Sequence, residues 1–479
     1  MEIVSGTQKK GFLILNSKVK NQVLVPKYYD PEINAILKAL SKTHDLPSIG
    51  ELVEDGTLQV RQGKEIGKME YGTGSIPFIR TSDMANWELK SDPKQGVSEE
   101  TYLKLQTKQD VQAEDILYVR DGTYLVGTAC ILTGDDAKIL YQSHISKIRV
   151  LRRDGIDPYL LLAILSGPMV LRQVYSKRLT ADIIDSLGER LFEIALPIPK
   201  DAQKRAEIST KTEAIVRKRS AFRRRIVEIP KEMQGLPKDA LISDSPRVPP
   251  YLLPIDKIQA NILIPKYYNP AIAKELVALE ARGWGLKTVG ELVAEGTISL
   301  ETGVEVGKMA YGTGDIPFVR TSDIANWGLL VLPKQGVSEE IYQEWRPRNE
   351  VRANDIFLVR DGTYLVGSSC LITERETKLL YCGGIYRIRV EKPEVLSPFL
   401  LLGLLNMPIV RWQMRAKQFT RDVIDTIGRR FSEVVLPLPR RQMEALRFSR
   451  EVEGILKEKQ ALLEAQRRIS REVAPATDA

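Results

Sequence analysis

The chain has 479 residues, of which 43% are hydrophobic and 28% are charged, and it carries a formal net charge of +8 with a pI near 9.1. This length exceeds what a single hydrophobic core usually supports, so we expect two or more domains. No apolar run approaches the roughly 18–20 residues of a membrane span, and the N-terminus lacks the pattern of a signal peptide. We therefore expect a cytoplasmic protein without a membrane partner.

The cysteines and histidines are too few and too scattered for a structural zinc site or a disulfide framework. Cys130, Cys370 and Cys382 form no C-x-x-C pair, and the two histidines, His44 and His144, do not cluster with them. Cys130 and Cys370 lie within apolar runs, which predicts that both are buried packing residues. We expect no metal site and no cofactor.

The predicted elements alternate between helices and strands. A helical pattern led by proline at 31–42 is followed by a short helix at 48–56 that ends in glycine. Strand patterns follow at 75–84, 115–132 and 138–152, the second of which contains an Asp-Gly turn. Residues 157–178 are helical in pattern but contain a proline that should kink or divide the helix. These elements indicate a compact α/β domain with a twisted sheet.

A long helix is predicted next, over 203–229, with Pro230 closing it. Apolar residues recur at every seventh position of this segment, at Ile208, Ile215, Phe222 and Ile229. The second line that a heptad seam requires is mostly polar, at Arg205, Thr212, Arg219 and Ile226. We expect one apolar stripe. The cation Arg219 either sets the register between paired helices or extends to solvent at the edge of a bundle.

The chain then repeats itself. A linker rich in proline and serine at 229–250 separates residues 12–230 from a second copy at 251–470, and "GSIPFIRTSDMANW" (74–87) returns as "GDIPFVRTSDIANW" (314–327). Of the 66 positions in 67–132, 41 are identical in 307–372. The second long helix repeats the stripe at Phe448, Ile455, Leu462 and Ile469 and has Lys459 in the place of Arg219, whereas its Gly454 weakens the helical pattern. Each helix of near 30 residues would be roughly 45 Å long.

Motifs of the common enzyme classes are absent from the sequence. There is no phosphate-binding loop, no H-E-x-x-H, no G-x-S-x-G and no methyltransferase tetrad of the form (D/N/S)PP(Y/F). The two histidines are not matched between the copies, so imidazole catalysis is not a duplicated property. "EDILYVRDG" (114–122) and "NDIFLVRDG" (354–362) place acidic residues beside a strand, as in a nuclease, but the acid-x-Lys that usually follows is missing. We interpret both segments as turns at strand ends.

The repeated side chains are instead suited to DNA. Arginine, threonine and serine can contact phosphates or base edges, and a basic residue next to tyrosine can do the same. The candidate DNA contacts are Lys27, Tyr28, Arg80, Thr81, Ser82, Arg120 and Tyr124 in the first copy and Lys266, Tyr267, Arg320, Thr321, Ser322, Arg360 and Tyr364 in the second. Two alternatives stay open. Each arginine could pair with a neighbouring aspartate (Asp83, Asp121, Asp323 or Asp361), and the tyrosines could belong to the core.

The order of globular unit, long helix, globular unit and long helix resembles the specificity subunit of type I restriction–modification systems. So do the segments "YYDPEI", "SIGELVEDG", "IPFIRTSD" and "LPIPKDAQKRAEI", and the resemblance extends over nearly the whole chain. The family's Glu-Gln pair at the start of the helices is reduced here to Gln203 and Gln442.

The resemblance implies an α/β fold class with two duplicated target recognition domains joined by two long antiparallel coiled-coil spacer helices in a pseudo-twofold arrangement. The implied boundaries are 1–200 for the first domain, 201–230 for spacer helix 1, 231–250 for the linker, 251–439 for the second domain and 440–479 for spacer helix 2 and the tail. The stripe from Ile208 to Ile229 should then pack against the stripe from Phe448 to Ile469.

The implied function is non-catalytic recognition of a bipartite double-stranded DNA site within a methylation-based defence complex. The implied partners are two adenine-N6 methyltransferase subunits, and a motor-nuclease subunit is a further candidate. Positions that differ between the copies, such as 142–146 against 382–386, predict related but non-identical half-sites. The alternatives are a nuclease or methyltransferase with an unrecognised site, and an adaptor that binds only proteins.

Overall fold

The computed structural model describes residues 19, 23–91, 93, 95–122, 125–181, 184–240, 246, 248–259, 262–330, 335–362, 365–421 and 424–474. The chain divides into two compact units. Unit 1 comprises Met1–Leu89, Pro93–Ser220 and Ala461–Ala479, and unit 2 comprises Lys90–Asp92 and Ala221–Gln460. Among the described residues, no helix is both long enough and apolar enough to cross a membrane.

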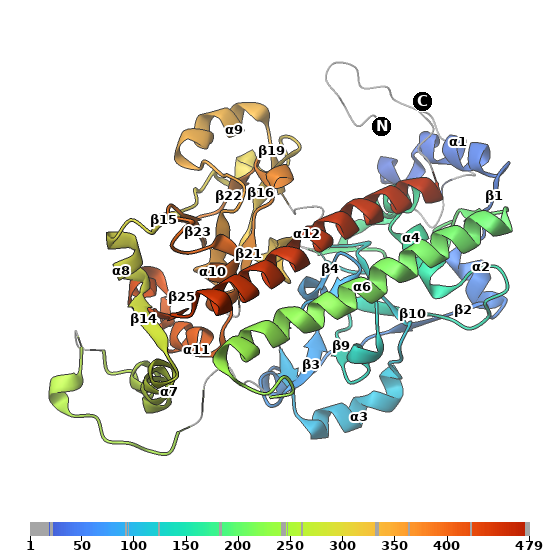
Figure 1. Cartoon of the computed structure of the whole chain (residues 1–479). Helices are drawn as coiled ribbons and strands as arrows, with labels where there is room; N and C mark the ends of the chain where they lie inside the picture. The colour runs from blue at the N-terminus through green and yellow to red at the C-terminus, as the bar shows by residue number, and fades with distance from the viewer. Residues whose placement is uncertain are drawn as a thin grey trace. The chain divides into compact units, whose positions relative to one another are not determined.

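Unit 1 mixes short helices with short strands (Figure 1). Its helices are α1 (Pro31–Leu40), α2 (Ile49–Glu54), α3 (Glu99–Gln109), α4 (Pro158–Leu165) and α5 (Pro168–Lys177). Its strands are β1 (His44–Asp45), β2 (Leu58–Gln62), β3 (Ile76–Ile79), β4 (Met84–Ala85), β5 (Glu88–Leu89), β6 (Gly96–Val97), β7 (Ile116–Val119), β8 (Ala129–Ile131), β9 (Leu140–Tyr141), β10 (Ile145–Val150), β11 (Leu179–Ala181), β12 (Ile184–Ser186) and β13 (Ile198–Pro199).

Unit 2 repeats this order of elements. Its helices are α7 (Pro270–Ala281), α8 (Val289–Ala294), α9 (Glu339–Trp345), α10 (Pro398–Leu405) and α11 (Pro408–Lys417). Its strands are β14 (Trp284–Thr288), β15 (Ile298–Thr302), β16 (Ile316–Val319), β17 (Ile324–Ala325), β18 (Gly328–Leu329), β19 (Gln335–Val337), β20 (Ile356–Val359), β21 (Ser369–Leu371), β22 (Leu380–Tyr381), β23 (Ile385–Val390), β24 (Phe419–Arg421), β25 (Ile424–Thr426) and β26 (Val435–Pro439).

The strands form several small sheets rather than the single twisted sheet expected from the sequence. In unit 1 the order β2-β10-β7-β8 is antiparallel throughout, and a second sheet has the order β6-β3-β9 with β3 and β9 parallel. Unit 2 has the same two orders, β15-β23-β20-β21 and β19-β16-β22. Because β3 and β9 are parallel, their carboxyl ends meet at one edge, and the same holds for β16 and β22.

The predicted helices at 31–42, 48–56 and 157–178 are confirmed. Asp30 caps α1, and α2 begins with a capping box formed by Ser48 and Glu51. After α2 the chain turns at Gly56, whose φ of 77° is a left-handed conformation that glycine adopts without strain. The pattern at 157–178 is divided into α4 and α5 immediately before Pro168, as the proline predicts.

The cores are apolar, and the cysteines belong to them. Cys130 and Cys370 are fully buried, which confirms the prediction, and burial raises the pKa of the Cys370 thiol well above its ordinary value. The most apolar helices, α4 and α10, lie against the long helices. In unit 2, for example, Met233 of one long helix and Val452 of the other both lie close to Gly403 of α10.

The first long helix, α6 (Ala202–Gln234), extends past Pro230, so the prediction that this proline ends it is wrong. Proline lacks only one hydrogen-bond donor, and Ile229, Met233 and Gln234 around it are buried, so packing holds the last turn in place. The helix ends at Gly235, which has a φ of 75°. There the amide of Leu236 donates to the carbonyl of Lys231 and the amide of Gly235 donates to that of Glu232, which together form a Schellman motif.

The second long helix is α12 (Gln442–Val473). On α6 and α12 the predicted stripe is buried at Ile208, Ile215, Ile229, Phe448, Ile455, Leu462 and Ile469, and half-buried at Phe222. The second line of α6 is buried as well, at Thr212, Arg219 and Ile226. The prediction of a single stripe is therefore wrong for α6. The helix buries a wider face because each of its two parts also packs on globular elements of the unit to which it belongs.

Within each unit, parts of the two long helices are neighbours (Figure 1). In unit 1, Lys211 of α6 lies 3.8 Å from the carboxylate of Glu472 of α12. In unit 2, Arg225 of α6 pairs with Glu451 of α12. The C-terminal end of α12 is also tied to β1, because the buried His44 donates from Nε2 to the carbonyl of Val473 (2.9 Å). In both units, residues that come late in one helix therefore lie beside residues that come early in the other.

Alanine substitutions at Gly454, within α12, and at Gly235, directly after α6, should change the stability of the protein in opposite directions. Gly454 lies on the exposed face of α12, and an added Cβ would meet no atom within 4 Å. We expect Gly454→Ala to raise the free energy of unfolding by about 1 kcal/mol, because alanine loses less backbone entropy in a helix. We expect Gly235→Ala to lower it by about 1–2 kcal/mol, because alanine is strained at positive φ. Urea unfolding of the two variants measures both effects, and equal signs would contradict the expectation.

Candidate nucleic-acid interface

The ends of several strands meet at one edge of unit 1, which we name strand-end face 1. It consists of Arg80 after β3, Arg120 and Asp121 after β7, the turn 142–144 after β9, and Ser186 of β12. Backbone hydrogen bonds hold these segments together. The amide of Gln142 donates to Ile79 (3.0 Å), those of Arg120 and Asp121 donate to His144 (3.0 and 3.2 Å), and that of Gly122 donates to Asp185 (2.8 Å).

Unit 2 builds strand-end face 2 with the same bonds. It consists of Arg320, Arg360, Asp361, the turn 382–384 and Thr426. The amide of Cys382 donates to Val319 (3.0 Å), those of Arg360 and Asp361 donate to Gly384 (2.8 and 3.1 Å), and that of Gly362 donates to Asp425 (2.8 Å). The repeat therefore places matched residues of the two copies in the same local geometry.

Arg80 and Arg320 do not form the ion pairs that the sequence left open. The carboxylate of Asp83 accepts from the backbone N–H of Arg80 (2.9 Å), and that of Asp323 accepts from the backbone N–H of Arg320 (2.8 Å). The guanidinium of Arg80 donates to the side chain of Gln142 at 3.4 Å, and that of Arg320 lies 5.8 Å from the ring centre of Tyr311. Both arginines are half-buried, and neither forms an ion pair with a described carboxylate.

Arg120 and Arg360 do pair with the aspartate that follows them. The Nη2 of Arg120 donates to Asp121 at 2.7 Å, and the same bond between Arg360 and Asp361 is also 2.7 Å. Burial raises the pKa of Asp121, but hydrogen bonds from Arg120 and Ser186 outweigh it and hold this pKa below its usual range. The ion-pair alternative thus describes Arg120 and Arg360, whose charge is already partly neutralised.

The two faces differ most in the turn beside these arginines. Unit 1 has Gln142, Ser143 and His144 there, and the ring of His144 lies 3.6 Å from the carboxylate of Asp121. Unit 2 has Cys382, Gly383 and Gly384, so no side chain extends from the last two positions. A Cβ added at Gly384 would lie 3.0 Å from the Thr321 side chain, which shows how closely the backbone approaches this residue. One scaffold thus presents different polar groups in its two copies.

The basic-aromatic pairs lie next to these faces. The Nζ of Lys27 lies 5.1 Å from the ring centre of Tyr175, and burial and the nearby Arg178 lower the pKa of Lys27. The negative charge of Asp185, in β12, raises the pKa of Lys27 and opposes this shift, so Lys27 lies near Asp185. The carbonyl of Asp185 accepts from the amide of Gly122, which places Lys27 next to strand-end face 1. Lys266 is similarly placed beside Asp425 in unit 2.

The tyrosines of these pairs are used internally. Tyr28 is buried, and its hydroxyl donates to Glu193 (2.5 Å) while Lys177 lies over its ring. Tyr267 is half-buried and makes the same contacts with Glu433 (2.5 Å) and Lys417. Tyr28 is therefore a core residue, as the alternative held, and is not available as a direct DNA contact.

The remaining candidates are partly exposed or lie outside the described residues. Thr81, Ser82, Thr321 and Ser322 are half-buried in 3-10 turns (Thr81–Asp83 and Thr321–Asp323) directly after Arg80 and Arg320. Tyr124 and Tyr364 lie outside the described residues.

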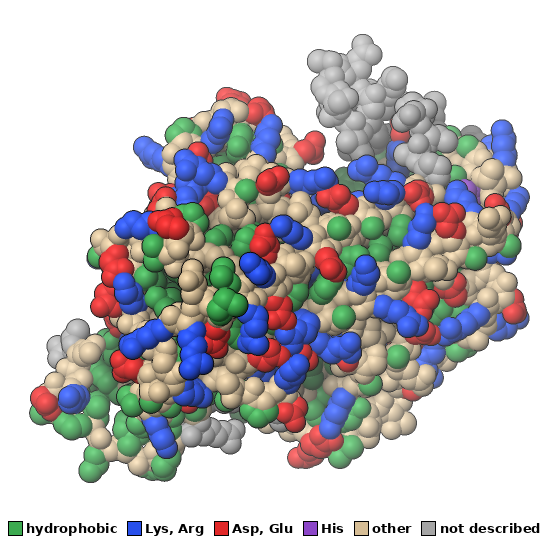
Figure 2. Space-filling model, viewed as in Figure 1, with side chains coloured by type: hydrophobic (Ala, Val, Ile, Leu, Met, Phe, Trp, Pro, Cys, Tyr) green, Lys and Arg blue, Asp and Glu red, His purple; other side chains and the backbone are tan. Residues whose placement is uncertain are grey.

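The sequence reasoning missed Arg178, which lies 4.8 Å from the Tyr175 ring centre and 3.6 Å from Asp185. The signal was the run of basic residues that ends α5. Figure 2 shows basic and acidic side chains interspersed over the face in view, so the net charge of the chain does not form one large patch there.

In each unit, a turn that follows Arg80 or Arg320 by a few residues contacts a long helix. The two-residue turn between β4 and β5 has positive φ at both residues, 50° at Asn86 and 69° at Trp87, which is unfavourable for a bulky side chain. The Nη1 of Arg219, on α6, donates to the carbonyl of Asn86, and the Nε1 of Trp87 donates to Ser166 (2.6 Å). In unit 2, Lys459 of α12 donates to the carbonyl of Asn326 (2.6 Å) in the matching turn.

Both interpretations are therefore wrong for Arg219. Arg219 neither pairs the helices nor extends to solvent, since its side chain is buried against the turn of its own unit. Burial lowers the pKa of the Arg219 guanidinium to about 10, so it is still charged at neutral pH. The sequence could not show this contact because Asn86 and Arg219 are far apart along the chain.

The acidic residues considered for a nuclease do not converge. Asp115 precedes β7 and Asp121 follows it, so the strand separates them. The fully buried carboxylate of Asp115 pairs with Arg149 (2.6 Å) and Lys147 (3.3 Å), and Asp355 pairs with Arg389 (2.7 Å) in unit 2. In the part of the chain that the structure describes, no group of three or more metal-ligating side chains is placed to hold a metal ion. The interpretation of these aspartates as structural is supported.

No protein-family model and no curated protein matches the chain. Several solved structures do. The type I restriction–modification S subunit from M. genitalium is 10% identical, with 90% of this chain and 96% of that chain covered and a TM-score of 0.37. A structure titled as the complex assembly and conformational transition of the type I R-M system is 16% identical, with coverages of 90% and 94% and a TM-score of 0.27.

The HsdS subunit from Thermoanaerobacter tengcongensis is 15% identical, with coverages of 88% and 95% and a TM-score of 0.25. The chain is thus similar along most of its length to three structures from type I systems.

The contact between helix and turn predicts a stability effect. We expect Arg219→Met to lower the free energy of unfolding by about 2 kcal/mol, because a hydrogen bond from a charged donor contributes roughly 1.5–3 kcal/mol. Arg219→Lys, which introduces the residue that unit 2 uses, should retain most of the stability. The control is Arg217→Met on the exposed face of α6, which we expect to change stability by less than about 0.5 kcal/mol. Urea unfolding tests the series, and a Met variant as stable as the wild type would show that the contact contributes nothing.

Proposed function

We propose that this chain is the DNA sequence-specificity subunit of a type I-like restriction–modification complex. Each unit reads one half of a bipartite double-stranded site through its strand-end face. The long helices set the distance between the half-sites, and their exposed faces dock two adenine-N6 methyltransferase subunits, with a motor-nuclease subunit as a further partner. The chain itself is not catalytic and acts in the cytoplasm.

The observation that carries the proposal is the duplicated strand-end face. Arg80 and Arg320 occupy matched positions and keep guanidinium groups that form no ion pair with a described carboxylate. Such a guanidinium can form bidentate hydrogen bonds with phosphate or guanine. A guanidinium that already pairs with aspartate has fewer N–H groups available for DNA. Two copies of such a face in one chain suit a site with two halves.

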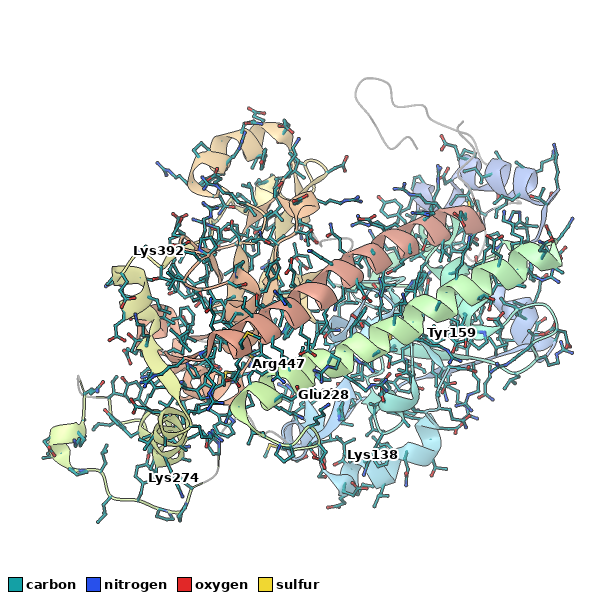
Figure 3. The ribbon with its side chains drawn as sticks, in the orientation of Figure 1. Lys138, Tyr159, Glu228, Lys274, Lys392 and Arg447 are labelled. Atoms are coloured by element: carbon teal, nitrogen blue, oxygen red, sulfur yellow. The ribbon has the colours of Figure 1, made fainter. Side chains whose placement is uncertain are left out.

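The helices support the second part of the proposal. With 33 and 32 residues, α6 and α12 are each about 50 Å long, more than one turn of B-DNA of roughly 34–36 Å. Both helices leave one side exposed. On α6 that side includes Glu207, Lys211, Arg217 and Lys218, and on α12 it includes Arg447, which Figure 3 labels. A charged exposed helix side of this length offers a docking surface for partner subunits.

Substitution of the matched arginines tests DNA binding. We expect Arg80→Ala and Arg320→Ala to weaken binding of the full-length chain to DNA. If the side chain contacts phosphate, all sequences should be affected and the salt slope should fall by about one; if it reads guanine, one base position should lose roughly 1–3 kcal/mol. Fluorescence anisotropy over a range of salt concentrations measures both. Thermal stability should be unchanged, because Asp83 bonds the backbone N–H, which alanine retains.

The chain offers matched controls for these variants. Arg152 and Lys392 occupy equivalent positions beyond the far ends of β10 and β23, away from the strand-end faces where these strands begin. Lys392 is labelled in Figure 3. Arg152→Ala and Lys392→Ala remove the same charge and should leave DNA affinity nearly unchanged. If they weaken binding as much as Arg80→Ala does, the effect comes from net charge and the assignment of the faces is wrong.

Exchange of the divergent turn tests the reading of half-sites. We expect the triple variant Gln142→Cys, Ser143→Gly, His144→Gly to alter the bases recognised in one half-site and leave the other unchanged, because hydrogen-bonding groups at base edges discriminate by roughly 1–3 kcal/mol. Sequencing of adenine methylation in cells that also contain the methyltransferase subunit reads out the motif. The reverse exchange in 382–384 should alter the other half-site. An undivided motif, or a motif unchanged in both variants, would refute the two-face arrangement.

Two outcomes would favour the alternatives. Purified chain that cuts or methylates DNA without partners would indicate an enzyme with an unrecognised site. Failure to bind DNA in a salt-sensitive way, with the partner subunits present, would indicate an adaptor that binds only proteins.

A further inference from the structure

Two methionines at matched positions are almost fully exposed. Met69 and Met309 have exposed fractions of 88% and 92%, and each lies in a 3-10 turn, Lys68–Glu70 in unit 1 and Lys308–Ala310 in unit 2. The segments around them read "GKMEYGTG" and "GKMAYGTG". Exposure of an apolar side chain forgoes the favourable free energy that its burial would contribute. Both copies therefore carry the same unburied apolar tip.

The loop that presents each methionine is held firmly. The hydroxyl of Thr73 donates to the carbonyl of Glu70 (2.7 Å) and accepts from the amide of Ser98 (3.0 Å), and Thr313 makes the same bonds in unit 2. A Cβ added at Gly96 would lie 2.1 Å from the carbonyl oxygen of Gly74, so the two backbones are in close contact. Gly336 and Gly314 make the same contact in unit 2. The exposure of the methionine is thus a property of a fixed backbone.

The same loop is joined to the strand-end face. At its start, a Cβ on Gly63 would lie 2.2 Å from the carbonyl oxygen of Gln142, so the two backbones touch. Glu65 accepts hydrogen bonds from Tyr71 (3.0 Å) and Ser143 (2.9 Å). In unit 2, Glu305 accepts from the amide of Gly383 (3.0 Å). The Arg320 guanidinium lies over the ring of Tyr311, two residues from Met309. Each methionine therefore flanks its face.

The charges of the loop favour a polyanion as the ligand. Lys68 and Lys308 are exposed directly before the methionines, and neither forms an ion pair with a described residue. The carboxylates of the loop are engaged in hydrogen bonds within the unit. Glu65 accepts from Tyr71 and Ser143 at the surface, and the half-buried Glu70 accepts from Thr101. An apolar tip next to a lysine, on a rigid loop beside an arginine, is suited to a base step flanked by phosphates.

We propose that Met69 and Met309 act as apolar wedges, each of which inserts its thioether side chain against a base step of the half-site held by its unit and partly unstacks it. This inference rests on the proposed function, because it requires that the strand-end faces bind DNA. It adds a contact that carries no hydrogen bond and that distorts the duplex locally.

The test uses full-length chain and a duplex of its recognition sequence, obtained by selection from a random pool, with 2-aminopurine placed at successive positions. We expect wild-type binding to raise the fluorescence at one step in each half-site. Met69→Ala should abolish the rise in one half-site only, Met309→Ala should abolish it in the other, and each should weaken binding about tenfold. Met69→Leu, which keeps an apolar tip, should retain the signal. Met443→Ala, at a methionine that is 81% exposed at the start of α12, should have no effect.

The outcomes separate the wedge from the proposed function. If the wild type shows no salt-sensitive DNA binding, the proposed function fails and the wedge fails with it. If the wild type binds DNA but Met69→Ala and Met309→Ala leave fluorescence and affinity unchanged, only the wedge is overturned. Variants that keep DNA binding and the fluorescence rise but lose methyltransferase assembly would show that the methionines contact protein, which also overturns it.

Discussion

In each unit one hydrogen bond joins a cation of a long helix to the carbonyl oxygen of a strained two-residue turn, and so connects the helix to the globular elements. Arg219 bonds Asn86 in unit 1 and Lys459 bonds Asn326 in unit 2, and both turns hold an asparagine and a tryptophan at positive φ. A backbone conformation of this kind persists only where its surroundings hold it. The helix supplies that support, and in return the turn fixes the position of the helix against the globular elements of its unit.

The repeated segment "IPF-RTSD-ANW" contains this contact in both copies. Its first residues form the strand that ends at Arg80 or Arg320, its aspartate closes the next turn by bonding the backbone of that arginine, and its last residues bond the helix cation. One short segment thus connects the face proposed to read DNA with the helix proposed to set the distance.

The scaffold and the surface of the strand-end faces obey different constraints. The same backbone hydrogen bonds recur in both units because matched strands must end in register. The buried ion pairs of Asp115 with Arg149 and of Asp355 with Arg389 also match. Side chains that take no part in these bonds are free to differ, as Gln142 and His144 differ from Cys382 and Gly384. A pair of related domains can in this way read different bases without a change of fold.

The sequence by itself determined the duplication, the short helices with their caps, the division of 157–178 at Pro168 and the burial of Cys130 and Cys370, because each depends on residues that are close along the chain or on apolar pattern alone. It did not determine where α6 ends, since packing around Pro230 overrides the missing donor and Gly235 supplies the left-handed turn. Only the tertiary structure decided which arginines are paired, that Tyr28 is buried, and that Arg219 bonds a turn more than a hundred residues away. The physical reason is that ion pairs and carbonyl contacts depend on which strands and helices become neighbours, and nothing local to Arg80 or Arg120 distinguishes the side chain left unpaired from the one that is neutralised.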